Sequence, residues 1–206
     1  MTGDKLIKKR KAFTIVEALV VMSIFTVLVT SMCDIYVQTS RYGRSIIMRA
    51  KLQADARNAI EAIARAIRVS NIDYSSYGGT LPAQPTSELR LINSKTGDTV
   101  RIKLSTFDAN HCNNDTKSSP CVDISTNGGV GAWAPLSPRG SKIDQLLFYV
   151  TPSQDPFLFD QATGLYAATT QPAVTIVMRT LGVGTKPSDN WLYTLQTSVT
   201  PRLYLR

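Results

Sequence analysis

The longest apolar stretch of the chain, residues 13–32, lies near the amino end and contains one charged residue, Glu17. About 20 apolar residues in a helix are enough to cross the hydrocarbon core of a membrane, because each residue adds about 1.5 Å. Four consecutive basic residues, 8–11, come just before this stretch. Basic residues that flank a span stay on the cytoplasmic side. The pattern therefore predicts a membrane helix over 13–33, with the amino end inside and the rest of the chain outside.

The next segment, residues 34–70, contains no proline, and its only glycine is Gly43. Apolar residues recur in it at spacings of three and four, as they do on one face of a helix. These residues are Leu52, Ala56, Ala59, Ile60, Ile63 and Ile67. The spacing predicts an amphipathic helix over 34–70 whose apolar face covers a sheet, with Gly43 as a weak point because an interior glycine costs up to about 1 kcal/mol. A coiled-coil seam is the alternative, although the spacing is not a strict heptad.

After residue 70 the pattern changes from helical to alternating. Residues 74–82 form a turn-rich link, and 94–98 form a hairpin loop between two candidate strands. The candidate strands are 88–92, 99–104, 145–150, 157–159, 165–168, 174–181 and 191–199. Residues 108–141 are mostly polar and predict a long insertion anchored by Trp133. No helical pattern separates the strands, so residues 71–206 should form an antiparallel sheet and the whole chain an α+β fold.

The segment around the start of the apolar stretch, Ala12-Phe13-Thr14-Ile15-Val16-Glu17, follows a basic leader. This arrangement resembles the prepilin signal of type IV pilins and type II secretion pseudopilins. The resemblance implies that a prepilin peptidase removes residues 1–12 by cutting between Ala12 and Phe13, and that Phe13 becomes N-methylated. The family usually has glycine before the cut, where this chain has Ala12, which is also small.

The charge of Glu17 needs a partner, because an ionised side chain at the centre of a span costs roughly 2.5–3.5 kcal/mol. The family resemblance implies that Glu17 faces the free α-amine of Phe13 in a neighbouring subunit and so fixes the register of a filament. Two opposite charges about 4 Å apart attract by roughly 4 kcal/mol at an effective dielectric of 20. The alternatives are an ordinary signal anchor and a secretory peptide, whose apolar core is only about 7–15 residues long.

The formal net charge of +8 changes little in this picture, because the five cations and one acid of the leader supply half of it. The leader's charge is a topology signal, and no basic cluster follows residue 51. Nucleic-acid binding is therefore not expected, although a DNA-uptake subunit that contacts DNA is a second alternative function. The length of 206 residues suits one globular domain outside the membrane.

Three cysteines are present, and two of them, Cys112 and Cys121, flank a polar loop. An extracytoplasmic location favours a disulfide between these two, with two free thiols as the alternative. Closing so short a loop contributes less than the ~3 kcal/mol expected for about 15 residues. Cys33, at the end of the apolar stretch, is expected to be a small buried hydrophobe.

Few residues point to catalysis. His111 is the only histidine, so no histidine-paired nucleophile or multi-histidine metal site can form. Oxygen-bearing side chains gather in 108–115, and some pseudopilins bind calcium, but the spacing does not fit an EF-hand. The glycines of 128–131 and 182–184 indicate turns. We therefore expect no enzyme activity, no cofactor and no metal; a signal-anchored extracytoplasmic enzyme or binding protein is the alternative.

The closing segment, residues 195–202, and the arginine-rich stretch 55–68 are similar to those of J-type pseudopilins and W-type minor pilins. This likeness and the length of the chain favour a minor subunit over a major one. The resemblance implies other pilin or pseudopilin subunits, the prepilin peptidase and an inner-membrane assembly platform as partners. It also implies a single-pass protein of the bacterial cytoplasmic membrane, with its head outside, that joins a filament.

Overall fold

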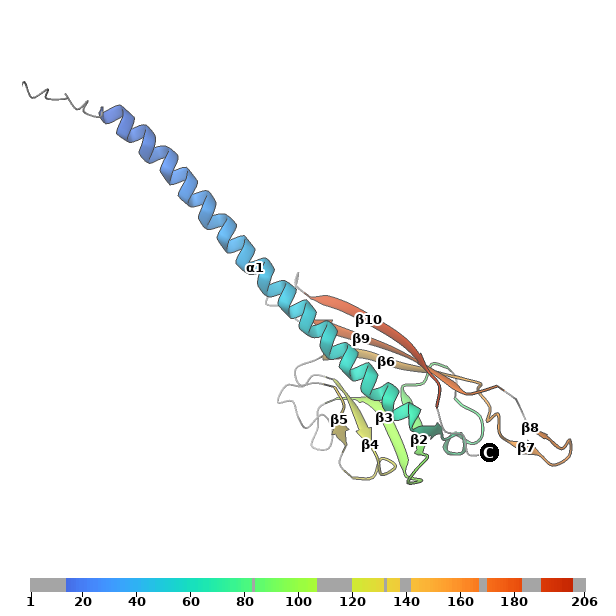
Figure 1. The fold of residues 1–206 in the computed structure, drawn as a ribbon. Helices are drawn as coiled ribbons and strands as arrows, with labels where there is room; N and C mark the ends of the chain where they lie inside the picture. The colour runs from blue at the N-terminus through green and yellow to red at the C-terminus, as the bar shows by residue number, and fades with distance from the viewer. Residues whose placement is uncertain are drawn as a thin grey trace, which may run out of the picture. The chain divides into compact units, whose positions relative to one another are not determined.

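The computed structural model describes residues 14–82, 84–106, 120–131, 133–137, 142–166, 170–182 and 190–201. It divides into two compact units at residues 47 and 48. Figure 1 labels the elements along the chain. They are α1 (Ile15–Arg68), β1 (Ser70–Ile72), η1 (Ser75–Tyr77), β2 (Glu88–Asn93), β3 (Thr99–Ser105), β4 (Cys121–Ser125), β5 (Ala134–Pro135), β6 (Lys142–Thr151), β7 (Phe159–Asp160), β8 (Leu165–Tyr166), β9 (Ala173–Gly182) and β10 (Trp191–Val199).

The helix α1 is 54 residues long, or about 80 Å at 1.5 Å per residue. It joins the predicted membrane helix and the predicted amphipathic helix into one element, and Gly43 does not interrupt it. The helix ends at Arg68, two residues before the expected boundary. Ser70 already pairs with Asn93 in β1, a strand that the sequence pattern did not predict.

The strands form two main sheets, and all of their pairings are antiparallel, as predicted. The five-stranded sheet has the order β1-β2-β3-β4-β5, and the three-stranded sheet has the order β10-β9-β6. Residues 94–98 join β2 to β3, with Gly97 at a φ of 78°, so the hairpin loop is confirmed. A helix followed by antiparallel sheets is the α+β class that the sequence predicts.

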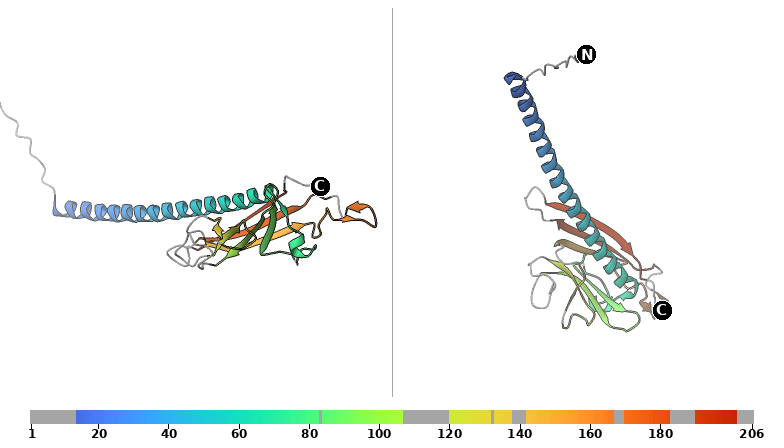
Figure 2. Two further views of the ribbon diagram at one scale, coloured as in Figure 1. Left: turned by 90° about the horizontal axis from the view of Figure 1, so that it is seen from below. Right: turned by 60° about the vertical axis from the view of Figure 1, so that its left-hand side comes forward.

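The core of the second unit lies between α1 and both sheets. The predicted apolar face of the helix is buried there, with Ile63 and Ile67 at 0% exposure. Leu89 and Ile102 reach the core from the five-stranded sheet, and Phe148, Ile176 and Met178 reach it from the three-stranded sheet. Figure 2 shows this part of α1 lying along the strands. The apolar face therefore packs within the chain and is not a coiled-coil seam.

The predicted insertion over 108–141 is partly wrong, because it contains β4 and β5. β4 pairs with β3 over five residues and is almost completely buried. Its residues Asp123 and Ser125 are buried although they are polar, so the strand lacks the alternation of apolar and polar residues that reveals a strand with one exposed face. Trp133 is buried, and Lys103 Nζ lies 4.4 Å from its ring centroid, which confirms its role as an anchor.

The strand predicted at 157–159 is Phe159–Asp160 in the structure, and residues 167 and 168 of the strand predicted at 165–168 lie outside the described part of the chain. Only Phe159–Asp160 and Leu165–Tyr166 pair, as a two-stranded ribbon separate from both sheets. Glycines 128, 129 and 131 have positive φ angles in a turn, as predicted, whereas Gly182 ends β9. Residues 108–115, with His111, lie outside the described part of the chain.

Tyr77 joins η1 to β2 through two hydrogen bonds of its hydroxyl group. The hydroxyl donates to the carbonyl oxygen of Glu88 at 3.0 Å and accepts from the N–H of Arg90 at 2.8 Å. The Arg90 guanidinium lies 5.2 Å from the ring centroid. Burial raises the pKa of Tyr77 to about 12. Tyr77 therefore holds the link between the two elements in its neutral form.

We expect Tyr77→Phe to lower the free energy of unfolding by about 1–3 kcal/mol, because the variant leaves two backbone groups without their partner. Denaturant unfolding of the full chain in detergent measures this, with Tyr149→Phe, at a residue 39% exposed, as the control. Tyr77 ionises near pH 10 in the unfolded chain and near pH 12 in the fold. Its contribution is thus full below pH 10 and lost between pH 10 and 12. An equal loss in both variants would contradict this role.

Candidate functional site

Thr14 caps the start of α1. The N–H of Glu17 donates to Thr14 Oγ1 at 3.3 Å, and the N–H of Ala18 donates to the Thr14 carbonyl oxygen at 3.2 Å. Thr-x-x-Glu ahead of an apolar run is the sequence pattern of a capping box. The sequence analysis missed this role, although the spacing of Thr14 and Glu17 signals it. Glu17 consequently lies in the first helical turn, where the helix dipole favours an acid by about 0.3–1 kcal/mol.

This position makes Glu17 easier to accommodate in a membrane than the cost at the centre of a span suggests. Glu17 lies four residues after Phe13, or about 6 Å from the start of the apolar stretch. Its side chain is exposed on the helix surface. The penalty at such a position is below that at the centre, so a single opposite charge is enough to offset it.

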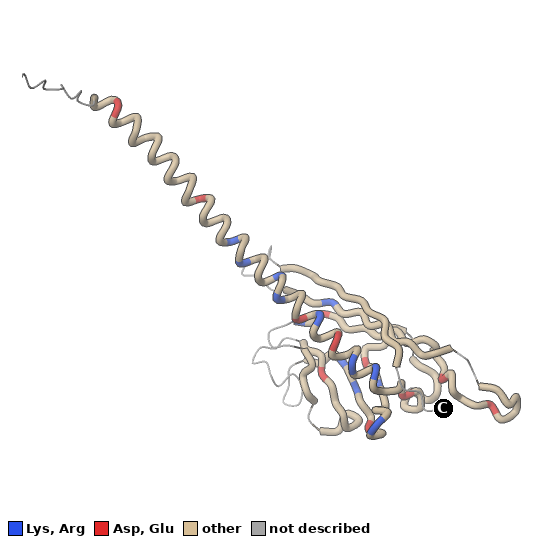
Figure 3. Tube along the Cα trace, in the orientation of Figure 1, with Lys and Arg blue, Asp and Glu red and all other residues tan. Residues whose placement is uncertain are grey.

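No cation of the described helix lies within reach of Glu17. Between Ile15 and Ser40 the only charged residues are Glu17 and Asp34, and the first basic residue is Arg41. Figure 3 shows this gap, with the blue positions beginning well along the helix. Arg41 lies 24 residues from Glu17, about 36 Å along the axis. A cation for Glu17 must therefore come from outside this helix.

The first unit presents a continuous apolar surface. Its large apolar side chains are exposed along the whole segment, for example Ile15 at 81%, Met22 at 69% and Phe25 at 63%. By length and composition the helix can cross a membrane, and none of its most apolar part is buried within the chain. An exposed apolar surface of this size marks a membrane or protein contact.

The hydroxyl groups within the apolar segment are satisfied by the helix itself. Ser23 donates to the carbonyl oxygen of Val20 at 2.8 Å, and Thr26 donates to that of Met22 at 2.8 Å. Thr30 and Ser31 likewise donate to carbonyl oxygens of the preceding turn. These four hydroxyls need no water, so they do not prevent the segment from fitting a hydrocarbon environment.

The other predicted site residues are placed only in part. Ala12, Phe13 and Cys112 lie outside the described residues, so the cleavage site, the methylation and the disulfide remain predictions. Cys121 begins β4 and is buried, with its Sγ 3.1 Å from Asp123 Oδ1. Cys33 is free and exposed on α1, so the expectation that it is buried is wrong.

The described head has a hollow of about 330 Å³ beside Tyr77, lined by Glu88, Arg90 and residues of the link before β2. Its charged groups bind one another, since Arg90 Nε donates to Glu88 Oε1 at 3.2 Å. Arg101 Nη1 lies 3.7 Å from the same oxygen. A second, smaller hollow lies between α1 and β10.

Residues 7–32 match the family described as the prokaryotic N-terminal methylation motif. The match includes the four basic residues 8–11, Ala12, Phe13 and Glu17, and confirms the type IV pilin-like leader. It supports a precursor of the pilin and pseudopilin kind that is processed by prepilin peptidase, anchored in a membrane and assembled with other pilin subunits. No curated protein and no solved structure matches the chain.

Proposed function

We propose that this chain is a structural subunit, a minor pilin or pseudopilin, of a type IV pilus or a type II secretion-like filament. The methylation motif carries this proposal, because it covers the start of a long helix with an exposed apolar surface. Residues 13–33 anchor the subunit in the bacterial cytoplasmic membrane with its amino end inside. The head, residues 71–206, lies outside.

Assembly follows from the chemistry of the amino end. Cleavage between Ala12 and Phe13 removes the leader and frees an α-amine at Phe13. Glu17 of a neighbouring subunit then pairs with this amine, and the pair offsets the cost of both charges in an apolar environment. In a filament that extends beyond the membrane, the exposed apolar side chains of α1 pack on neighbouring helices, which gains about 25 cal/mol for each Å² kept from water.

The minor-subunit hypothesis draws on the carboxyl end of the chain. Residues 195–202 include the end of β10, and their sequence is similar to the closing strand of J-type pseudopilins and W-type minor pilins. β10 pairs with β9 along nine residues without a register shift. A subunit of this kind works with an inner-membrane assembly platform and sibling subunits, for secretion, adhesion or DNA uptake.

We propose a structural rather than a catalytic role for the head. The charged groups of its larger hollow already bind each other, which supports this choice over a signal-anchored enzyme. Direct DNA contact is also less favoured. Arg90 and Arg101 both form ion pairs with the carboxylate of Glu88. Arg179 Nε donates to Asp144 Oδ2 at 2.6 Å. The charges of these three arginines are therefore partly neutralised within the chain.

The mass of the amino terminus tests the proposal. We expect protein isolated from its native host to begin with N-methylated Phe13 and to lack residues 1–12. Ala12→Leu should block processing, because a large side chain replaces the small residue before the cut, whereas Ala18→Leu should be processed normally. An intact leader on the wild-type protein would contradict the proposed function.

A further inference from the structure

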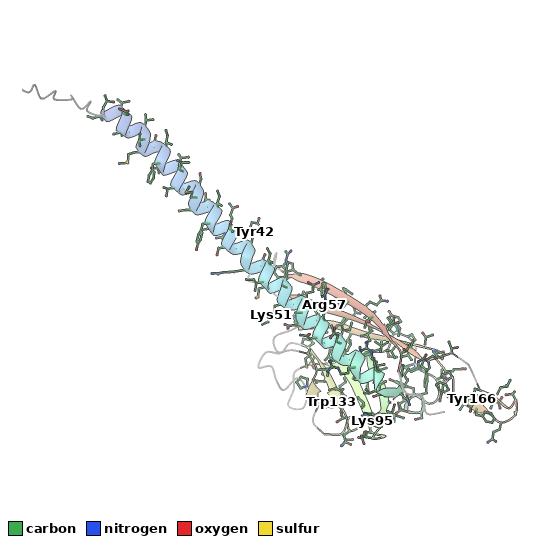
Figure 4. The ribbon with its side chains drawn as sticks, in the orientation of Figure 1. Tyr42, Lys51, Arg57, Lys95, Trp133 and Tyr166 are labelled. Atoms are coloured by element: carbon green, nitrogen blue, oxygen red, sulfur yellow. The ribbon has the colours of Figure 1, made fainter. Side chains whose placement is uncertain are left out.

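A short hairpin, residues 155–166, projects from the head as an arm. β7 and β8 pair within it, and the rings of Phe159 and Tyr166 meet edge to face with centroids 5.4 Å apart. Figure 4 places Tyr166 at the far end of the head from the point where α1 enters it. Four large apolar side chains of the arm are exposed: Leu158 at 63%, Phe159 at 51%, Leu165 at 67% and Tyr166 at 52%. Four exposed large apolar side chains on one short hairpin indicate a contact surface.

The arm is also acidic. It carries Asp155 and Asp160 and no lysine or arginine. The Asp160 carboxylate accepts hydrogen bonds from the N–H of Ala162 and the hydroxyl of Thr163, both at 2.9 Å. These bonds lower the pKa of Asp160 and fix its carboxylate on the exposed turn. Each carboxylate oxygen has a second lone pair, so Asp160 can still bind a cation.

The opposite end of the second unit, which includes the last part of α1, has a hollow of complementary chemistry. We call it the arginine–tryptophan pocket. It is lined by Arg49, Leu52, Gln53, Trp191, Leu192 and Tyr193 and has a volume of about 240 Å³. The Arg49 guanidinium lies 4.5 Å from the centroid of the Trp191 ring, and Gln53 Nε2 lies 3.1 Å from the hydroxyl of Tyr193. No acidic residue lines it.

The composition and size of this pocket fit protein side chains. Arginine, tryptophan and tyrosine are the residues most enriched at the energetic centres of protein interfaces. The volume is below the range of about 300–1,000 Å³ that is usual for small-molecule sites. The ring of Trp191 holds the Arg49 guanidinium in place, where it can bind a carboxylate with two parallel hydrogen bonds.

The two surfaces lie at opposite ends of the same unit. β10 starts near the point where α1 meets the strands, and the β7–β8 arm extends beyond the carboxyl end of α1 (Figure 1 and the left view of Figure 2). A contact between such surfaces cannot close on itself in a dimer. It adds each copy to the next in the same direction, which generates an open chain wherever the rotation between copies does not close a ring.

We propose that the β7–β8 arm of one copy docks in the arginine–tryptophan pocket of a second copy. Asp160 binds the Arg49 guanidinium, and the rings of Phe159 and Tyr166 pack against Trp191 and Leu192. This inference rests on the proposed filament function and names a head contact within it. The contact requires two consecutive copies of this chain in the filament. A lipid surface is a poorer occupant, because an anionic membrane would repel the two acids of the arm.

Disulfide cross-linking in the native host tests this contact. Two differently tagged full-length copies carry Cys33→Ser, one with Gln161→Cys in the exposed turn of the arm, which keeps Asp160, and the other with Gln53→Cys in the pocket. We expect mild oxidation to link the two tags. In the control pair, Asp98→Cys replaces Gln161→Cys. Asp98 is also exposed in a hairpin loop, and this pair should give at least tenfold less product.

Exchanging the two charges between copies tests the predicted ion pair between Asp160 and Arg49. Arg49→Glu should lower cross-linking several-fold, and adding Asp160→Arg on the partner copy should restore it, as measured with cysteines at Phe159 and Leu192. No link between copies, or a link only to another subunit, overturns the docking proposal. If the Cys33→Ser protein nonetheless enters filaments, the proposed function stands. If this protein is never found in filaments, the function itself fails.

Discussion

Glu17→Gln should leave the protein inserted and its head folded, but should lower its incorporation into filaments about tenfold or more. Glutamine keeps the size of the side chain and is the other residue found at this place in a capping box, so the start of α1 is preserved. The variant loses only the charge that would pair with a neighbouring α-amine. At about 1.4 kcal/mol for each factor of ten, a pair of roughly 4 kcal/mol can account for such a loss.

The measurement compares the amount of protein in sheared filaments with the amount in the membrane. Asp34→Asn is the matched control, because Asp34 is the other acid in the first part of α1 and lies beyond the apolar stretch. It should be incorporated normally. Equal incorporation of the Glu17→Gln variant and the wild type would refute the register role. A loss of the folded head would show that the variant acts through stability instead.

Ile63→Ala should destabilise the head by about 2–5 kcal/mol. Ile63 is fully buried between α1 and the sheets, so truncation removes apolar contacts and leaves a cavity. Ile47→Ala is the matched control on the same helix, because Ile47 is 68% exposed and belongs to the first unit. Its effect should be within about 0.5 kcal/mol.

Denaturant unfolding of both variants in detergent, followed by tryptophan fluorescence, measures the difference. Trp133 and Trp191 both lie in the head, so the signal reports this unit. If Ile47→Ala lost as much stability as Ile63→Ala, the assignment of the buried face would be wrong. The pair of variants thus separates the face of α1 that stabilises the subunit from the segment that we propose for assembly.

Periodicity predicted the parts of this fold whose burial is one-sided. The spacing of Ile60, Ile63 and Ile67 revealed the buried face of α1, and alternation revealed β2, β3 and β9. The same reasoning failed for β4, because Asp123 and Ser125 are buried together with their apolar neighbours. The pattern of a strand covered on both faces differs from that of a half-exposed one.

The chemistry of the amino end was more accessible from sequence than the chemistry of the head. The leader, Ala12, Phe13 and Glu17 form a continuous motif, whereas the capping role of Thr14 depends on one hydrogen bond from the N–H of Glu17. The pocket between Arg49 and Trp191 joins residues 142 positions apart. Such a contact depends on tertiary packing and leaves no local signal.

Because the helix starts just after Thr14, cleavage before Phe13 would also place a new positive charge beside the helix start. Once Phe13 is the first residue, its ammonium group stands one position ahead of a helix end that already carries about half a positive charge. Like charges placed so close repel, and the cut peptide bond does not re-form. A single mature subunit is therefore less stable in the membrane than its precursor. The carboxylate of a neighbouring subunit would offset this repulsion. Under the proposed function, an irreversible cleavage would in this way supply part of the free energy that favours polymerisation.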